Sequence, residues 1–163
     1  MIDKQKLVVK IIEKLQQELD NAVFAAETAR TDATDDQSVA ETQYDTLGIE
    51  ASYLAHGQSE RAEKLKQQIN QYKKLKPVNF SSDDEINIGC LVQLSSQKHN
   101  SLYFIGPSAG GIKVLIAEQD VIIITPQAPI AQLLIGKFQY DEIPTLGKER
   151  DSNMGMIEIL AVY

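Results

Sequence analysis

The first half of the chain contains two long stretches in which apolar residues recur at helical spacing. In the first stretch they recur every three or four positions from Leu7 to Ala26, with no interrupting glycine or proline. This pattern predicts one helix from about residue 4 to about residue 30. In the second stretch the apolar positions form a narrower stripe from Leu47 to Tyr72, as in a coiled-coil seam. We therefore expect two long helices.

A polar segment, Thr31-Asp32-Ala33-Thr34-Asp35-Asp36-Gln37-Ser38, separates the two stretches. Its residue types favour caps and turns over helix interiors. Ser38 fits the N-cap of the second helix, and Glu41, three residues on, completes a capping box. Two helices joined by a short polar loop usually lie antiparallel. We predict a helical hairpin with arms of about 27 and 36 residues, on the order of 40 to 50 Å long.

Two glycines, Gly48 and Gly57, fall within the second stretch. Each costs about 1 kcal/mol relative to alanine in a helix interior. The second helix is therefore expected either to begin late, so that the polar tip reaches Gly48, or to bend. Tyr44 and Tyr53 are most simply interpreted as packing against the first helix.

The periodicity changes after Lys76-Pro77, where the second helix is expected to end. We assign residues 1–76 to the hairpin, 77–84 to a linker and 85–163 to a second domain. In that domain, short runs rich in Val, Ile and Leu are separated by Gly, Pro, Ser and Asn, which is typical of strands. The predicted strands are Cys90–Leu94, Leu102–Ile105, Ile112–Ile116, Val121–Ile124 and Met156–Val162.

A short helix is predicted between the fourth and fifth strands, since Pro129 stands near its start and Gly136 just past its end. The glycine-rich segment Gly106–Gly111 lacks the Lys-Ser/Thr ending of a phosphate-binding loop and is expected to form a hairpin turn. The second half is therefore predicted to be an antiparallel sheet with one packed helix, which gives the chain an α+β fold.

Composition limits the function. The hydrophobic fraction of 43% and charged fraction of 24% are those of a soluble globular protein. A net charge of −7 argues against general affinity for nucleic acid, so any contact with RNA must be local or indirect. The sequence shows neither a membrane-spanning run nor a signal-peptide pattern, and we expect a cytoplasmic monomer.

The cysteine and histidine residues indicate neither a reactive thiol nor a metal site. The single cysteine, Cys90, cannot form an internal disulfide, and its apolar neighbours indicate a core position rather than a reactive thiol. His56 and His99 have no Cys or His partner at the spacing of metal ligands, which argues against a zinc site.

Acidic residues gather around the predicted tip of the hairpin. They are Glu27, Asp32, Asp35, Asp36, Glu41 and Asp45, against one cation, Arg30. Such a tip either is merely solvated or presents carboxylates to a partner.

Basic residues gather near the end of the second helix, opposite in charge to the tip. They are Arg61, Lys64, Lys66, Lys73, Lys74 and Lys76. The simpler interpretation is a solvated face. The alternative is a salt-sensitive contact with RNA or with an acidic rim of a partner.

The segment Ile124-Thr125-Pro126-Gln127-Ala128-Pro129-Ile130-Ala131-Gln132-Leu133-Leu134-Ile135-Gly136-Lys137 resembles the GreA/GreB transcript cleavage factors of bacterial RNA polymerase. That family has, at this place, a strand, a Ser-Pro type turn, a small residue, an Ala/Leu-rich helical turn and Gly-Lys. The closing residues Ile157–Tyr163 and the early helical residues Glu13–Leu19 are also similar to the family's final strand and opening helix.

The resemblance implies a function. In the family, the coiled-coil finger enters the secondary channel of RNA polymerase while an FKBP-like domain docks on the channel rim. Two tip carboxylates help hold a second Mg²⁺ and orient a water, so that the polymerase hydrolyses backtracked RNA. The chain would then be a cofactor of the polymerase rather than an enzyme, with no stably bound cofactor of its own. The docking residues implied are Pro126, Pro129, Ala131, Gly136 and Lys137.

The tip departs from the family. The usual tip reads Gly-Asp-x-x-Glu-Asn-x-Glu-Tyr, and anchoring its Tyr on Tyr53 places Thr46 and Ile49 where the functional carboxylates stand. Asp35 and Asp36 are then the pair that would share the polymerase Mg²⁺, with the other tip carboxylates beside them. An inhibitory paralogue with an aspartate-rich tip is known in the family, so both stimulation and inhibition of cleavage fit this sequence.

A second class of function is an FKBP-like prolyl isomerase or chaperone that uses the coiled coil for dimerisation. Isomerase pockets of that fold are lined with aromatic side chains. This chain has no Trp and only 6% aromatic residues, so the sequence favours the transcription regulator.

Overall fold

The computed structural model describes residues 3–34, 47–76, 79–95, 100–144 and 156–163. The chain divides into two compact units. Ile12–Asn70 form the first, which we call the hairpin unit. Met1–Ile11 and Gln71–Tyr163 together form the second, which we call the sheet unit. The start of the first long helix and the end of the second therefore belong to the sheet unit.

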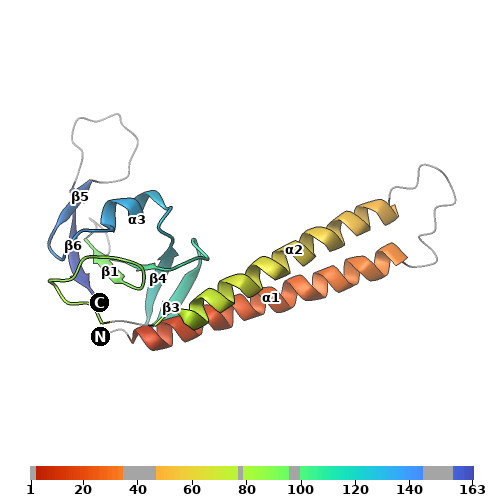
Figure 1. Cartoon of the computed structure of the whole chain (residues 1–163), viewed down its shortest axis with the longest axis horizontal. Coiled ribbons are helices and arrows are strands. Elements are labelled where there is room, and N and C mark those ends of the chain that lie inside the picture. Colours follow the sequence, from red (N-terminus) through yellow and green to blue (C-terminus); the bar gives the residue numbers. More distant parts are fainter. Residues whose placement is uncertain (1–2, 35–46, 77–78, 96–99, 145–155) are drawn as a thin grey trace. The chain divides into compact units, whose positions relative to one another are not determined.

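Two helices make up the predicted hairpin, α1 (Lys4–Thr34) and α2 (Leu47–Lys74), and they run antiparallel (Figure 1). Asp3 caps α1, because its Oδ1 accepts hydrogen bonds from the backbone N–H groups of Gln5 (2.9 Å) and Lys6 (3.2 Å). The predicted capping box of Ser38 and Glu41 lies outside the described residues. The helical hairpin and the α+β class are confirmed.

The seam of the hairpin unit changes composition along its length. Toward residues 12 and 70 it buries large aliphatic side chains such as Leu15, Leu65 and Ile69. Farther along, Ala22 and Ala29 are the buried seam residues of α1. Small side chains bury less apolar area. The half of the hairpin unit toward residues 34 and 47, which we call the distal half, is therefore held by weaker packing than the half toward residues 12 and 70, which we call the base.

The described strands form one six-stranded sheet in the order β3-β4-β2-β1-β6-β5. Every neighbouring pair is antiparallel except β2 and β4, which are parallel. A short helix, α3 (Pro129–Leu134), follows β4, as predicted. The strands are β1 (Leu91–Leu94), β2 (Ser101–Ile105), β3 (Lys113–Ile116), β4 (Gln119–Ile124), β5 (Glu142–Pro144) and β6 (Met156–Val162).

Two predictions about the sheet are wrong in detail. The sheet is mixed rather than wholly antiparallel, and Gly106–Gly111 is no hairpin turn, because β2 and β3 are not neighbours. The chain leaves β2, crosses to the edge as β3, and returns through the two-residue turn Ala117-Glu118 as β4. Strand β4 is thereby placed between β3 and β2, and it runs in the direction of β2.

The core of the sheet unit lies between the sheet and α3 (Figure 1). Ala131 and Leu134 of α3 are fully buried against strand residues such as Val92, Ile105 and Ile159. Within the same unit, the helix ends contribute further buried side chains, Leu7, Ile11 and Tyr72. Lys10 Nζ donates a hydrogen bond to the carbonyl oxygen of Leu115 (2.7 Å), which joins α1 to β3.

Candidate functional site

The described part of the acidic tip ends on α1 and resumes on α2. Asp32 lies in the exposed last turns of α1. The other predicted tip carboxylates, Asp35, Asp36, Glu41 and Asp45, lie outside the described residues, as does Thr46. Ile49, the second position where the family carries a carboxylate, lies in the first turn of α2 with its side chain exposed. The carboxylate pair proposed for Mg²⁺ thus remains a prediction.

The distal half of the hairpin unit also exposes large apolar side chains. Phe24 of α1 and Tyr53 of α2 are both exposed. The expectation that Tyr53 packs against the first helix is therefore wrong, and Tyr44 lies outside the described residues. A prediction of Phe24 as a surface residue could have been made from its position, two residues after the buried seam residue Ala22.

A shallow groove of about 370 Å³ runs beside the seam of the hairpin unit. Small side chains line it, among them Ala26, Ala55 and Ser59. Four charged residues share the lining, two of each sign, so its described residues carry no net formal charge. They are Glu27, Arg30, Glu63 and Lys66.

The basic residues of α2 are paired in part within the hairpin unit. Arg61 Nη2 lies 3.7 Å from Glu18 Oε2, and Lys66 Nζ lies 3.6 Å from Glu63 Oε2. Such exposed pairs contribute at most about 1 kcal/mol each. Their partial neutralisation favours the interpretation of this face as solvated.

The segment that resembles the cleavage factors folds as a strand, a turn and a helix. The backbone N–H of Ala128 donates to the carbonyl oxygen of Thr125 (2.9 Å), which closes the turn that contains Pro126. Pro129 then begins α3, where its missing N–H needs no partner. Ala131 is fully buried, so it is not available for direct contact with a partner. It contributes to any docking surface only by packing α3 against the sheet.

The far end of this segment is fixed by backbone hydrogen bonds. Gly136 has a φ of 80°, a conformation that glycine adopts readily. Its N–H donates to the carbonyl oxygen of Ile86 (2.9 Å), and the N–H of Ile86 donates to that of Lys137 (2.8 Å). The exposed side chain of Lys137 therefore projects from an anchored backbone. Pro129, Gly136 and Lys137 are exposed and Pro126 is half-buried, so these four are accessible for contact.

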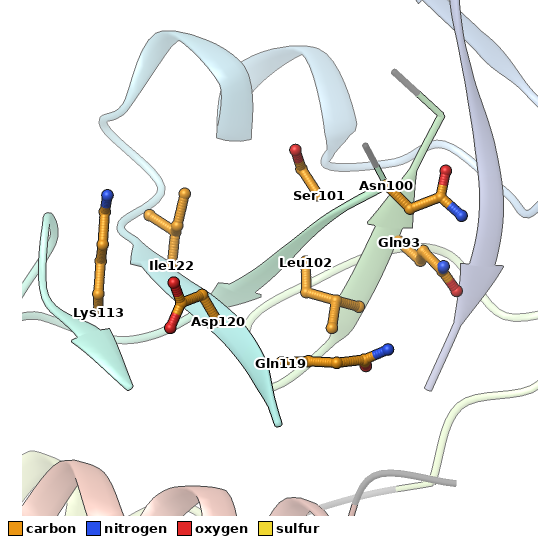
Figure 2. Close-up of a pocket in the computed structure, with 8 residues that line it drawn as sticks. All are labelled: Gln93, Asn100, Ser101, Leu102, Lys113, Gln119, Asp120 and Ile122. Atoms are coloured by element: carbon orange, nitrogen blue, oxygen red, sulfur yellow. The ribbon is translucent and has the colours of Figure 1, made fainter. Parts of the chain in front are cut away.

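A polar pocket of about 320 Å³ lies where β2 and β4 begin. Figure 2 shows Lys113 on one side of it and Asn100 with Gln93 on the other. Among the described residues that line it, no side chain is aromatic. The lining residues are Gln93, Asn100, Ser101, Leu102, Lys113, Gln119, Asp120 and Ile122.

The sheet unit holds a buried thiol and a buried ammonium group. Cys90 is fully buried, as predicted, and burial raises the pKa of its thiol to about 11. Lys4 is also buried, with its Nζ 4.7 Å from the centre of the Phe80 ring, and burial lowers the pKa of its ammonium group. The raised pKa keeps Cys90 in its protonated form, which is a poor nucleophile at neutral pH.

No metal-binding cluster of His, Cys, Asp and Glu side chains occurs among the described residues. Nε2 of His56 lies 3.6 Å from Glu60 Oε1 one helical turn on, in an exposed pair, and His99 lies outside the described ranges. Among the helices that the structure describes, none has the length and apolar character needed to cross a membrane.

Comparisons with known proteins give structural matches only. No protein-family model and no curated protein matches the chain. Among solved structures, it is similar to GreA factor homolog 1 (Gfh1) of Thermus thermophilus, with 15% identity, coverage of 93% of this chain and 94% of that one, and a TM-score of 0.35. Gfh1 of Thermus aquaticus gives 13% identity, coverage of 98% and 93%, and a TM-score of 0.38. A third structure, of the transcription factor Gfh1, gives 17% identity, coverage of 93% and 92%, and a TM-score of 0.37.

Proposed function

We propose that this protein is a transcription elongation regulator that binds bacterial RNA polymerase. In this proposal the helical hairpin enters the secondary channel and brings its acidic tip near the active-site Mg²⁺. The sheet unit docks at the channel rim through Pro126, Pro129, Gly136 and Lys137. The chain is a cofactor of the polymerase and performs no chemistry alone.

The observation that carries this proposal is the folding of Ile124–Lys137. The residues that resemble the cleavage factors form a strand, a closed turn and a proline-initiated helix, which is the arrangement expected from that resemblance. The same chain holds a helical hairpin whose α1 has 31 residues, about 46 Å at 1.5 Å per residue. A hairpin of this length supports insertion into a deep channel.

Between stimulation and inhibition of RNA cleavage, the described residues favour inhibition. On the Tyr53 register, Ile49 presents an exposed aliphatic side chain where the cleavage factors carry a carboxylate. The hydrocarbon side chain of isoleucine can neither ligate Mg²⁺, which prefers oxygen ligands, nor orient a water by hydrogen bonding. We therefore propose that the finger occupies the channel and that its acidic tip acts at the active-site Mg²⁺ without completing the site for RNA cleavage.

The prolyl isomerase function is less well supported. A substrate proline needs an apolar, aromatic-lined pocket, whereas the described side chains that line the pocket of Figure 2 are six polar and two aliphatic ones. A protease-coupled assay on a cis-proline peptide tests this alternative directly, and we expect no rate above the uncatalysed isomerisation.

The proposal is tested by binding. Fluorescently labelled chain should bind bacterial core RNA polymerase, and an unlabelled cleavage factor of the GreA/GreB family should displace it competitively. Binding without competition would place the chain elsewhere on the polymerase. No binding at micromolar polymerase would reject the function.

A further inference from the structure

In the described part of the hairpin unit, exposed large apolar side chains are confined to its distal half. Among the described residues of this unit, Tyr53 is 75% exposed, Phe24 71%, Ile49 57%, Leu54 55% and Val23 36%. The basal parts, residues 12–22 and 55–70, expose no large apolar side chain among their described positions. Single exposed apolar residues are normal on a protein surface, but a group of them at one end marks a contact site.

The two aromatic residues of this group point in opposite directions. Phe24 follows the buried seam residue Ala22 by two positions, and Tyr53 precedes the half-buried seam residue Ala55 by two. Two positions correspond to about 200° around a helix, so each ring points away from the partner helix. A flat docking surface could cover one ring but not both. An occupant that covers both must close around the hairpin.

Charge restricts the identity of that occupant. Residues 23–57 contain seven carboxylates and one cation, Arg30, which gives a formal charge of −6 out of −7 for the whole chain. The carboxylates are Glu27, Asp32, Asp35, Asp36, Glu41, Asp45 and Glu50. Two copies of this segment would repel each other, whereas Lys and Arg side chains on a partner would attract it.

We propose that the distal half of the hairpin inserts into a protein cavity whose walls carry Lys and Arg side chains and two apolar pockets, which receive Phe24 and Tyr53. Buried aromatic side chains typically supply a large share of binding energy, while rim charges mainly raise the association rate. This inference rests on the proposed function, because it takes the polymerase channel as the cavity. It assigns affinity to the aromatic residues, separately from any effect of the tip carboxylates on transcription.

The double variant Phe24→Ala/Tyr53→Ala of the full chain tests the inference. Both side chains are exposed, so helix content by circular dichroism and the melting temperature should match the unmodified chain. The Kd for core RNA polymerase should rise at least about tenfold, equivalent to about 1.4 kcal/mol. The dependence of Kd on salt should stay unchanged, because no charge is removed. Leu115→Ala in the sheet unit, whose side chain is 58% exposed, is the matched control and should bind as the unmodified chain does.

Each other outcome has a defined meaning. If the unmodified chain binds polymerase and the double variant binds with the same Kd, the inference fails while the proposed function stands. If the unmodified chain does not bind, both fail. Sedimentation equilibrium gives the remaining test, since a dimer of the unmodified chain that the double variant abolishes would show that a second copy covers these rings.

Discussion

The hydroxyl group of Tyr72, in the last turn of α2, donates a hydrogen bond to the carbonyl oxygen of Ser108 across 2.8 Å. Its ring is fully buried and lies against Gly106, which has no side chain. The contact joins the end of α2 to the loop after β2 within the sheet unit.

Replacing Gly106 with alanine should therefore destabilise the sheet unit. The added Cβ would collide with the Tyr72 hydroxyl group, and overpacking of this kind typically costs about 1 to 3 kcal/mol. Tyr72→Phe alone should cost about 1 kcal/mol, because it removes the hydrogen bond to Ser108.

The double variant is the stronger test, since Tyr72→Phe removes the atom with which the new Cβ collides. Gly106→Ala should therefore destabilise less in the Tyr72→Phe background than alone, by about 1 kcal/mol in urea unfolding. Strictly additive effects would contradict this account of the contact.

A glycine on the hairpin should behave in the opposite way. Gly57 lies inside α2, and an added Cβ would meet no atom within 4 Å. Gly57→Ala should therefore stabilise the hairpin unit by about 1 kcal/mol through helix propensity alone. Thermal melting followed by circular dichroism at 222 nm, to which the 31 residues of α1 and the 28 residues of α2 contribute, measures the change. A loss of stability would show that Gly57 has a role that its open surroundings do not reveal.

Cys90 should react slowly with thiol reagents. With a pKa of about 11 instead of the ordinary 9.0, the folded protein holds about a hundredfold less thiolate at pH 8 than the unfolded chain, and burial slows access further. The reaction rate with a chromogenic disulfide should rise with pH through 10 and 11 in the folded protein. In denaturant it should level off above pH 9. Rapid labelling of the folded protein at pH 8 would contradict the burial of this thiol.

The tip carboxylates should affect activity more than binding. Asp35→Ala/Asp36→Ala is expected to leave the fold intact and the Kd for polymerase within about threefold, or 0.7 kcal/mol, while removing the effect on transcription. A matched control is Glu13→Ala/Glu18→Ala, which removes two carboxylates from α1 far from the tip in sequence. If the tip variant regulates elongation as the unmodified chain does, the carboxylates are merely solvated.

The sequence predicted those elements that local patterns determine. The seam from Leu7 to Tyr72 specified the two helices, and Pro129 with Gly136 bounded α3. Strand β5 was not predicted, since its three residues bury only Ile143 and end in a proline, too short for a visible alternation. The parallel pairing of β2 with β4 also escaped prediction, because it depends on contacts between segments distant in sequence.

The candidate site was less accessible to sequence reasoning. The charge pattern predicted the acidic tip, but most of its carboxylates lie outside the described residues. The exposure of Phe24 could be predicted from its spacing of two residues from Ala22. It was missed because the apolar pattern was used only to identify the buried face of the helix. The accessibility of Lys137 and the burial of Ala131 required the position of α3 on the sheet.

The most direct test of the central claim is a transcription assay on a stalled, backtracked complex of bacterial RNA polymerase. The purified chain should slow RNA extension in a concentration-dependent way and leave the length of the backtracked RNA unchanged. Shortening of the RNA from its 3′ end would show that the chain stimulates cleavage and would contradict the proposed inhibition. Extension and cleavage that are both unaffected at saturating protein would contradict a function on RNA polymerase altogether.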